Sequence, residues 1–410
     1  MTDTDPTARR NRAAFWTAAA VPALALWASG APTPVYPLYG TQWHLTTEAT
    51  TTIFAVYPLA LIVVLAVFGD LSDTIGRKRS MIAGIGAIAL GSLLFAVAPD
   101  LTVVLIGRVL MGIGVGLSLS PATAAMVDHA GPGASSRASS IATAATALGL
   151  TLATLVGGAL VEYAPEPLHL SYAVLLVVAL VVGAAVLRLP GDRPAGASRW
   201  RPRGLRVPRS LLGVVLAAAA CVAAAYSLGA LELSLGADIG ENLIGTSNAF
   251  VVGAIVSVTS IIIGVVALAA RRVPASIAGS VGGLVSLLST GVLVAAGAVH
   301  SLPLFLLFAV LSGIGYSLLF SAGLAIVGRY APQHHRASTL SAVYLAGYLV
   351  QGVMALWLGA QATSGGLQEA VDLALPAVGG FGLLAMVLVL VLATPRRSRG
   401  AQPPLNTSSP

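Results

Sequence analysis

The sequence of 410 residues is poor in charge and in reactive side chains. Only 9% of its residues are charged and 57% are hydrophobic, whereas soluble domains carry about a quarter charged residues. A soluble fold is therefore excluded. The single cysteine, Cys221, has no partner for an internal disulfide, and no spacing of metal ligands exists. No phosphate-cradling loop is present, which excludes direct ATP hydrolysis, and we expect neither a cofactor nor a metal.

Long apolar runs fill most of the chain instead. About 20 apolar residues suffice to cross a bilayer, and the sequence predicts twelve such runs. They are 13–38, 47–68, 81–98, 101–127, 139–162, 168–189, 210–234, 246–269, 275–297, 302–328, 338–361 and 371–393. The predicted fold class is an all-α integral membrane protein, with twelve transmembrane helices and the lipid bilayer as a partner.

The basic residues indicate the orientation. If the N-terminus lies inside, every arginine and lysine except Arg108 falls on the cytoplasmic side, as the positive-inside rule requires. The net charge of +7 then reflects topology and not binding to nucleic acid. An even number of spans places both termini in the cytoplasm. The composition, rich in alanine, valine and glycine, is typical of a high-GC bacterial genome, so we expect a bacterial plasma membrane.

The chain divides into two halves. Residues 190–209 alternate proline with arginine, a composition that opposes packing and predicts a basic cytoplasmic linker; a surface helix is the alternative. The predicted segments are a tail (1–12), a six-helix bundle (13–189), the linker, a second six-helix bundle (210–393) and a C-terminal tail (394–410).

An internal repeat supports this division. Val109-Leu110-Met111-Gly112-Ile113-Gly114 in span four returns as Val310-Leu311-Ser312-Gly313-Ile314-Gly315 in span ten. Two copies of six spans that both begin inside are parallel repeats, pseudo-symmetric about the membrane normal. Such repeats place the substrate near the midplane, between the halves.

One short loop carries the most specific motif. Between spans two and three the chain reads Gly69-Asp70-Leu71-Ser72-Asp73-Thr74-Ile75-Gly76-Arg77-Lys78-Arg79. This loop resembles the signature loop of the major facilitator superfamily, and the chain as a whole is closest in character to the twelve-span drug:proton antiporters. The resemblance implies gating by Gly69, Asp73, Gly76, Arg77 and Asp128, with Asp73 near the start of span eleven. The alternative is a loop that only fixes topology.

Arg108 is the one cation predicted inside a span. It lies about 10 Å inside span four, counted from the start of the span near residue 101, where a charge is costly unless it faces a cavity or a partner. The segment Arg108–Gly114 also resembles the superfamily's fourth-helix motif, in which the arginine is linked to proton coupling; Met111 stands where glutamine is frequent. Snorkelling to the external interface is the alternative.

Span five matches the antiporter pattern in part. Gly149 and Gly157-Gly158 are present, but Ala153-Thr154 replaces the Gly-Pro pair of the drug:proton antiporters. Small residues also permit close helix packing without any transport role. The pattern therefore supports export only weakly.

Aromatic and amide side chains near mid-depth suggest the substrate site. The candidates are Trp27, Tyr57, Tyr226, Tyr316, Phe320, Tyr344, Tyr348 and Gln351. Helical spacing puts Tyr344, Tyr348 and Gln351 on one face, and such groups suit an amphipathic ligand; packing between helices is the alternative. Span one lacks an acid, so Glu232 near the external end of span seven is the second candidate for proton coupling, unless it is merely interfacial.

These features predict a monomeric secondary transporter that works by alternating access. The first hypothesis is proton-driven export of a small amphipathic compound such as a drug or antibiotic. The alternative is proton-coupled or facilitated uptake of a sugar or small organic acid. A third class, an intramembrane enzyme or a receptor, lacks a catalytic constellation in the sequence, so we expect no enzyme.

Overall fold

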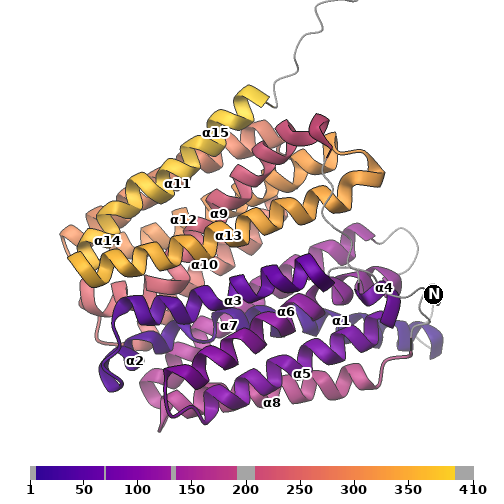
Figure 1. Cartoon of the computed structure of the whole chain (residues 1–410), viewed down its shortest axis with the longest axis horizontal. Helices are drawn as coiled ribbons and strands as arrows, with labels where there is room; N and C mark the ends of the chain where they lie inside the picture. The colour runs from indigo at the N-terminus through magenta and orange to yellow at the C-terminus, as the bar shows by residue number, and fades with distance from the viewer. Residues whose placement is uncertain (1–5, 69–70, 131–134, 192–207, 393–410) are drawn as a thin grey trace, which may run out of the picture.

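The computed structural model describes residues 6–68, 71–130, 135–191 and 208–392, and all regular structure in these ranges is helical. Twelve helical segments are long and apolar enough to cross a membrane. They form two bundles that lie side by side, one from each half of the chain (Figure 1). The predicted fold class is confirmed. The exact boundaries of the two halves remain a prediction.

The first half contains eight α-helices and one 3-10 turn. They are α1 (Pro6–Gly30), η1 (Thr33–Val35), α2 (Tyr36–Gln42), α3 (Thr47–Phe68), α4 (Leu71–Ile75), α5 (Arg77–Ala96), α6 (Leu101–His129), α7 (Ser135–Tyr163) and α8 (Pro167–Leu187). Segments α1, η1 and α2 together make the first span. The helix of this span breaks after α1 at Pro32, because proline has no N–H to continue the helix.

The second half repeats this plan. Its elements are η2 (Arg209–Leu211), α9 (Leu212–Asp238), the π-turn η3 (Ile239–Leu243), α10 (Ala249–Ala269), η4 (Ala270–Arg272), α11 (Ala275–Ala298), α12 (Leu302–Tyr330), α13 (Gln333–Gly365), α14 (Leu367–Ala374), the π-turn η5 (Leu375–Gly379) and α15 (Gly380–Leu392). Segments α14, η5 and α15 together make the last span.

The predicted end of span seven at residue 234 is wrong. The helix continues through Asp238, and the π-turn carries the span to Leu243. The polar residues of this stretch suggest a loop in sequence, but Asp238 is 9% exposed and packs inside the protein. The chain turns only at Gly245, whose φ of 80° favours glycine. Two further acids, Asp238 and Glu241, therefore belong to this span.

Small residues let the helices approach closely. In the first half, a Cβ added at Gly91 of α5 would lie 2.7 Å from the Gly107 carbonyl oxygen of α6. The corresponding helices of the second half are close as well, since a Cβ at Gly315 of α12 would lie 3.2 Å from the Ser286 amide nitrogen of α11. Without a hydrophobic effect between helices in lipid, such contacts supply the packing energy.

The two halves meet along two pairs of helices, α3 with α13 and α7 with α10. We call the end of the bundles that holds Arg77 and Arg329 the basic end, and the end that holds Glu162 and Glu241 the acidic end. In Figure 1 the basic end is at α4, and the acidic end is at α2 and α14.

The halves are hydrogen-bonded to each other at the acidic end. Three bonds of 2.8 Å cross the interface there: Thr33 Oγ1 to the Leu233 carbonyl, the Glu48 amide to Thr363 Oγ1, and the Ala249 amide to Glu162 Oε2. The last bond places a carboxylate at the N-terminus of α10, where the helix dipole favours negative charge. The structure is therefore closed at the acidic end.

Candidate functional site

Five of the eight predicted substrate residues form one aromatic cluster in the second half. Its members are Tyr226, Tyr316, Phe320, Tyr344 and Tyr348, from α9, α12 and α13. The ring centroids of Tyr226 lie 4.8 Å from Tyr348, 5.9 Å from Phe320 and 6.1 Å from Tyr316. Phe320 also lies 6.2 Å from Tyr344. These separations fall within the range of favourable aromatic pairs.

Gln351 of α13 lies beside this cluster with an unused acceptor. Its side chain is 9% exposed, and its Oε1 has no hydrogen-bond partner among the described residues. Gly229 of α9 faces the same place: a Cβ there would lie 3.3 Å from the Tyr316 ring and 3.7 Å from Gln351 Nε2. Since buried polar groups are normally paired, this oxygen is suited to accept a bond from a ligand.

The first half contributes Tyr57 and Arg108 next to this region. Tyr57 lies on α3, which packs against α13, the helix that carries Tyr344 and Tyr348. The Arg108 guanidinium carbon lies 4.8 Å from the centroid of the Tyr57 ring, which is within cation–π range. Trp27 of α1 packs against the hydrophobic core and makes none of the ring contacts that define the cluster in the described part of the chain.

The Arg108 side chain is fully buried and donates to three backbone carbonyls. Its Nε bonds to Ile53 at 3.0 Å, its Nη1 to Ala28 at 3.0 Å and its Nη2 to Ser29 at 2.8 Å. In a regular helix the Ala28 carbonyl would receive the N–H of residue 32, but Pro32 has none. Arg108, on α6, therefore supplies the hydrogen bond that the broken first span lacks.

This geometry decides part of the sequence hypothesis for Arg108. The snorkelling alternative is wrong, because the guanidinium is 0% exposed. The side chain instead faces polar partners, as the cost of an intramembrane cation demands. Its role in proton coupling stays a prediction.

Glu232 of α9 is also buried, at 3% exposed, so the interfacial alternative is wrong. Its Oε1 is hydrogen-bonded to Thr259 Oγ1 of α10, and Ser312 Oγ of α12 lies 3.4 Å from its Oε2. Neither hydroxyl was a candidate from the sequence. Ser312 occupies the position in the span-ten repeat that corresponds to Met111 in span four. Of the two hydroxyl residues, only Ser312 is therefore marked by a pattern in the sequence.

Part of the predicted gating cluster is observed at the basic end. Arg77 forms an ion pair with Asp128 and donates to the Ala124 carbonyl at 3.1 Å. Gly76, with φ of 94°, makes the turn before α5. Gly69 lies outside the described residues, as does the side chain of Asp73, so the approach of Asp73 to span eleven stays a prediction.

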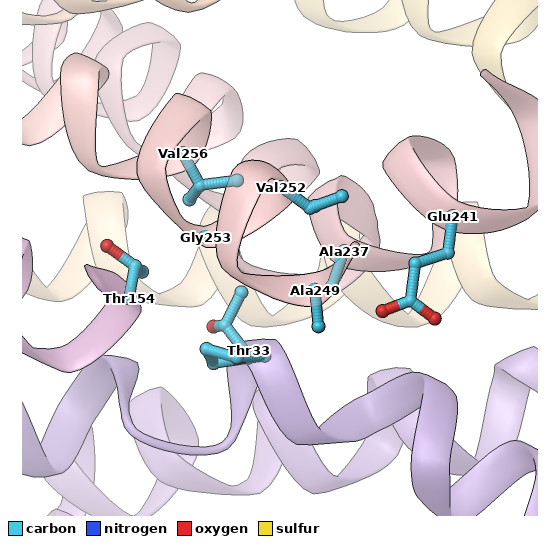
Figure 2. A pocket seen from close by; sticks show the side chains of 9 residues that line it. Thr33, Thr154, Ala237, Glu241, Ala249, Val252, Gly253 and Val256 are labelled. Carbon is cyan, nitrogen blue, oxygen red and sulfur yellow. The ribbon is translucent and has the colours of Figure 1, made fainter. Parts of the chain in front are cut away.

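A small cavity lies between the halves near the acidic end. Figure 2 shows Thr33 and Thr154 from the first half facing Ala249 and Gly253 of α10, with the Glu241 carboxyl at one edge. The cavity borders the hydrogen bonds that close this end. The sequence gives no signal for this cavity, because its lining depends on the extension of span seven to Glu241.

The span-five glycines serve helix packing. Gly149 faces the Ala23 backbone of α1, and a Cβ at Gly157 would lie 2.8 Å from Pro34. A Cβ at Gly158 would lie 2.8 Å from the Ala249 carbonyl oxygen in the other half. These contacts agree with the packing alternative for the glycines and also place α7 in the interface between the halves.

Comparison with known proteins gives the class. The profile of the Major Facilitator Superfamily matches residues 18–290. The chain is a member of this superfamily of transporters, and the resemblance found in the signature loop is confirmed.

Several curated relatives are similar over part of the chain. The uncharacterised MFS-type transporter EfpA of Mycobacterium tuberculosis is 33% identical over 165 residues, which cover 39% of this chain and 29% of EfpA. The multidrug efflux pump LfrA of Mycolicibacterium smegmatis is 31% identical over 164 residues, 38% of this chain and 32% of LfrA. The matched part spans about a third of these relatives. They agree with the resemblance to drug:proton antiporters.

Solved structures show the same fold over nearly the whole chain. A peptide transporter POT aligns with a TM-score of 0.76 at 16% identity, covering 92% of this chain and 94% of its own. A bacterial homologue of the human lysosomal transporter Spinster, in an inward-facing and unoccupied conformation, aligns with a TM-score of 0.72 at 16% identity, covering 94% and 98%. The chain is thus a multi-pass membrane protein with a transporter fold.

Proposed function

We propose that the protein is a secondary transporter that exports a small amphipathic compound, such as a drug or antibiotic, in exchange for protons. The observation that carries this proposal is the aromatic cluster with the unpaired Gln351 oxygen. Aromatic rings provide apolar contact, and a single buried acceptor selects a ligand with a hydrogen-bond donor. Efflux proteins among the relatives support export. Since the relatives and structural neighbours are transporters, we propose no enzymatic activity.

Alternating access is supported by the way the halves meet. The closing contacts at the acidic end are three hydrogen bonds and a few close glycine contacts. Each such bond contributes only about 0.5–1.5 kcal/mol, so the interface can open and close. The substrate site lies between the two halves, next to Tyr57 from one and Tyr348 from the other. We propose that a single chain, acting as a monomer, performs the cycle.

Uptake of a sugar or small organic acid is the second candidate function. It is favoured by Arg108, because a buried guanidinium can bind a carboxylate. However, its donors already reach three backbone carbonyls, and the cluster offers few polar groups for a sugar. Export therefore fits the described side chains better.

Transport of two amphipathic probes tests export. Ethidium and puromycin would be measured in proteoliposomes with an imposed pH gradient. Accumulation against a concentration gradient is expected, and Tyr226→Ala should raise the half-saturating concentration by about tenfold, through loss of aromatic contact. Trp16→Ala, at a side chain 52% exposed, is the control and should match the wild type. Gradient-driven movement of a sugar or organic acid, with neither probe transported, would establish the uptake alternative.

We also propose a plasma-membrane location with both termini, and therefore the basic end, in the cytoplasm. Two single cysteines test this in a Cys221→Ser background. One replaces Ser198 of the linker, outside the described residues, and the other replaces Ser301, which precedes α12 at the acidic end. An impermeant thiol reagent applied to intact cells should label position 301 only. Labelling of position 198 alone would show that the orientation is inverted.

A further inference from the structure

Glu232 lies where three helices of the second half meet. The carboxyl group, on α9, meets the Thr259 hydroxyl of α10 and the Ser312 hydroxyl of α12. Both hydroxyl-bearing residues are themselves buried, at 5% and 0% exposed. Most other buried hydroxyls of the second half bond to a carbonyl of their own helix, as Ser234 does to Ala230 at 2.6 Å. Thr259 and Ser312 instead turn toward an acid on another helix.

No salt bridge to a cation is formed by this acid among the residues that the structure describes. Among the helices that pack against α9, α10, α11 and α15 contain no charged residue. The charged residues and histidines of the other packed segments lie at their ends: Arg209, Arg329, His334, His335 and Arg336 at the basic end, and Glu48 and Glu241 at the acidic end. On α9 itself the only other acid is Asp238, and the remaining titratable groups are tyrosines and Cys221, which are uncharged near neutral pH. A permanently ionised Glu232 would therefore be a buried charge without a counter-ion, which is costly.

The hydrogen bonds around Thr259 give a second indication. Its Oγ1 lies in hydrogen-bond contact with Glu232 and also 2.9 Å from the Ala309 carbonyl oxygen. A hydroxyl has one hydrogen to donate, so it cannot donate to both oxygens at once. If the acid is protonated, its O–H donates to Thr259 and Thr259 donates to Ala309. If the acid is ionised, the Thr259 hydroxyl turns to the carboxylate. The site can therefore form hydrogen bonds with both the protonated and the ionised form of Glu232.

The position of Glu232 on α9 connects the substrate site to the closed interface. Toward the basic end, Gly229 faces Tyr316 and Gln351. Toward the acidic end, the carbonyl of the next residue, Leu233, accepts the bond from Thr33 that joins the halves. A change in the protonation of Glu232 therefore acts on the part of α9 that lies between the substrate site and the Thr33–Leu233 hydrogen bond.

We infer that Glu232, Thr259 and Ser312 form a proton-binding site that couples protonation to closure of the acidic end. The inference rests on the proposed transport function. When the acidic end is open, the Glu232 carboxylate takes one proton from outside water, which forms a carboxylic acid O–H bond. The neutral acid can then be buried as the halves close. The proton later leaves to water reached from the basic end, which restores the carboxylate, and no oxidation or reduction occurs.

Infrared difference spectroscopy tests the site without any substrate. The full-length protein in lipid nanodiscs would be titrated with pH, and the carbonyl stretch of protonated carboxylic acids followed. A band that titrates is expected in the wild type, absent from Glu232→Gln and retained in Asp238→Asn, the neighbouring buried acid. A wild-type spectrum in Glu232→Gln, or loss of the band only in Asp238→Asn, would overturn the assignment.

The hydroxyls are positioning residues, and the pH midpoint of the band reports on them. Bonds to a charged acceptor are stronger than bonds between neutral groups, so Thr259→Val should destabilise the ionised form more than the neutral one. Its midpoint should move toward higher pH, by about one unit. Thr290→Val and Ser234→Ala, whose hydroxyls bond within their own helices, are the controls. An unmoved midpoint in both Thr259→Val and Ser312→Ala would remove the hydroxyls from the site.

Transport separates this inference from the proposed function. Glu232→Gln should lose pH-gradient-driven accumulation of ethidium or puromycin by at least about tenfold yet keep exchange of labelled for unlabelled probe. If Glu232→Gln keeps coupled transport, the protein is a coupled transporter and the proton site is elsewhere. If the wild type transports neither probe while its band titrates at Glu232, export fails and the proton site stands.

Discussion

Replacing Arg108 with alanine is expected to abolish transport. The change leaves the carbonyls of Ala28, Ser29 and Ile53 without their guanidinium donors. Each buried acceptor left unsatisfied costs about 1–3 kcal/mol, and the Ala28 carbonyl cannot recover a helical bond because Pro32 follows. We expect the broken first span to shift and Tyr57 to lose its cation–π partner. The rate of pH-gradient-driven transport in proteoliposomes should fall at least about tenfold, with insertion monitored in parallel.

Two further variants make this result specific. Arg108→Lys should rescue transport only in part, because an ammonium lacks the planar fork that reaches three carbonyls at once. Arg329→Ala removes an exposed arginine at the basic end and should behave like the wild type. Undiminished gradient-driven accumulation by Arg108→Ala would remove this residue from proton coupling and leave Glu232 as the remaining candidate.

The sequence predicts that Arg108 needs polar partners, but it does not predict which partners these are. Its depth in an apolar run shows that it needs polar partners, because hydrocarbon does not solvate a cation. Which partners it finds depends on the tertiary approach of α1 and α3 to α6. The break at Pro32 is visible in sequence, but no local pattern shows that Arg108 donates the hydrogen bond that the Ala28 carbonyl lacks.

The aromatic cluster, too, could be predicted from the sequence only in part. Tyr344, Tyr348 and Gln351 share a helix face by spacing alone, so their grouping could be predicted. The contact of the Tyr226 ring with Tyr348, at 4.8 Å between centroids, requires the packing of α9 on α13. Thr259 was not predictable, because a lone threonine in an apolar helix usually bonds its own backbone. The end of span seven was misplaced because Asp238 and Glu241 look like loop residues although they continue the helix.

The signature loop is informative because it matches a family and not because of local helix geometry. Its residues predict a family, and through it a fold and a gating role. The family and the fold are confirmed. Of the gating residues, the structure describes the Arg77–Asp128 pair and the Gly76 turn. The contact between Asp73 and span eleven depends on a side chain outside the described residues.

Gly253→Val is expected to hold the acidic end open. A Cβ at Gly253 of α10 would overlap the Thr154 carbonyl oxygen of α7 and lie 3.1 Å from the Gly158 Cα. Both neighbours are backbone, which cannot rotate away, so the valine must push α7 and α10 apart. Overpacking typically costs about 1–3 kcal/mol, and 1.4 kcal/mol already shifts a two-state population about tenfold. The bond between Glu162 and the Ala249 amide should break as well.

Spin labels measure this opening directly. Cysteines in place of Pro165 and Ser247, both exposed and on opposite halves, would report a longer distance in Gly253→Val than in the Cys221→Ser background. Gly86→Val is the matched control, because a Cβ there meets nothing within 4 Å. Transport should fall at least about tenfold in Gly253→Val and stay normal in Gly86→Val. Because an exchanger must close each end in turn, an unchanged label distance with normal transport would mean that α7 and α10 do not form the closing contact.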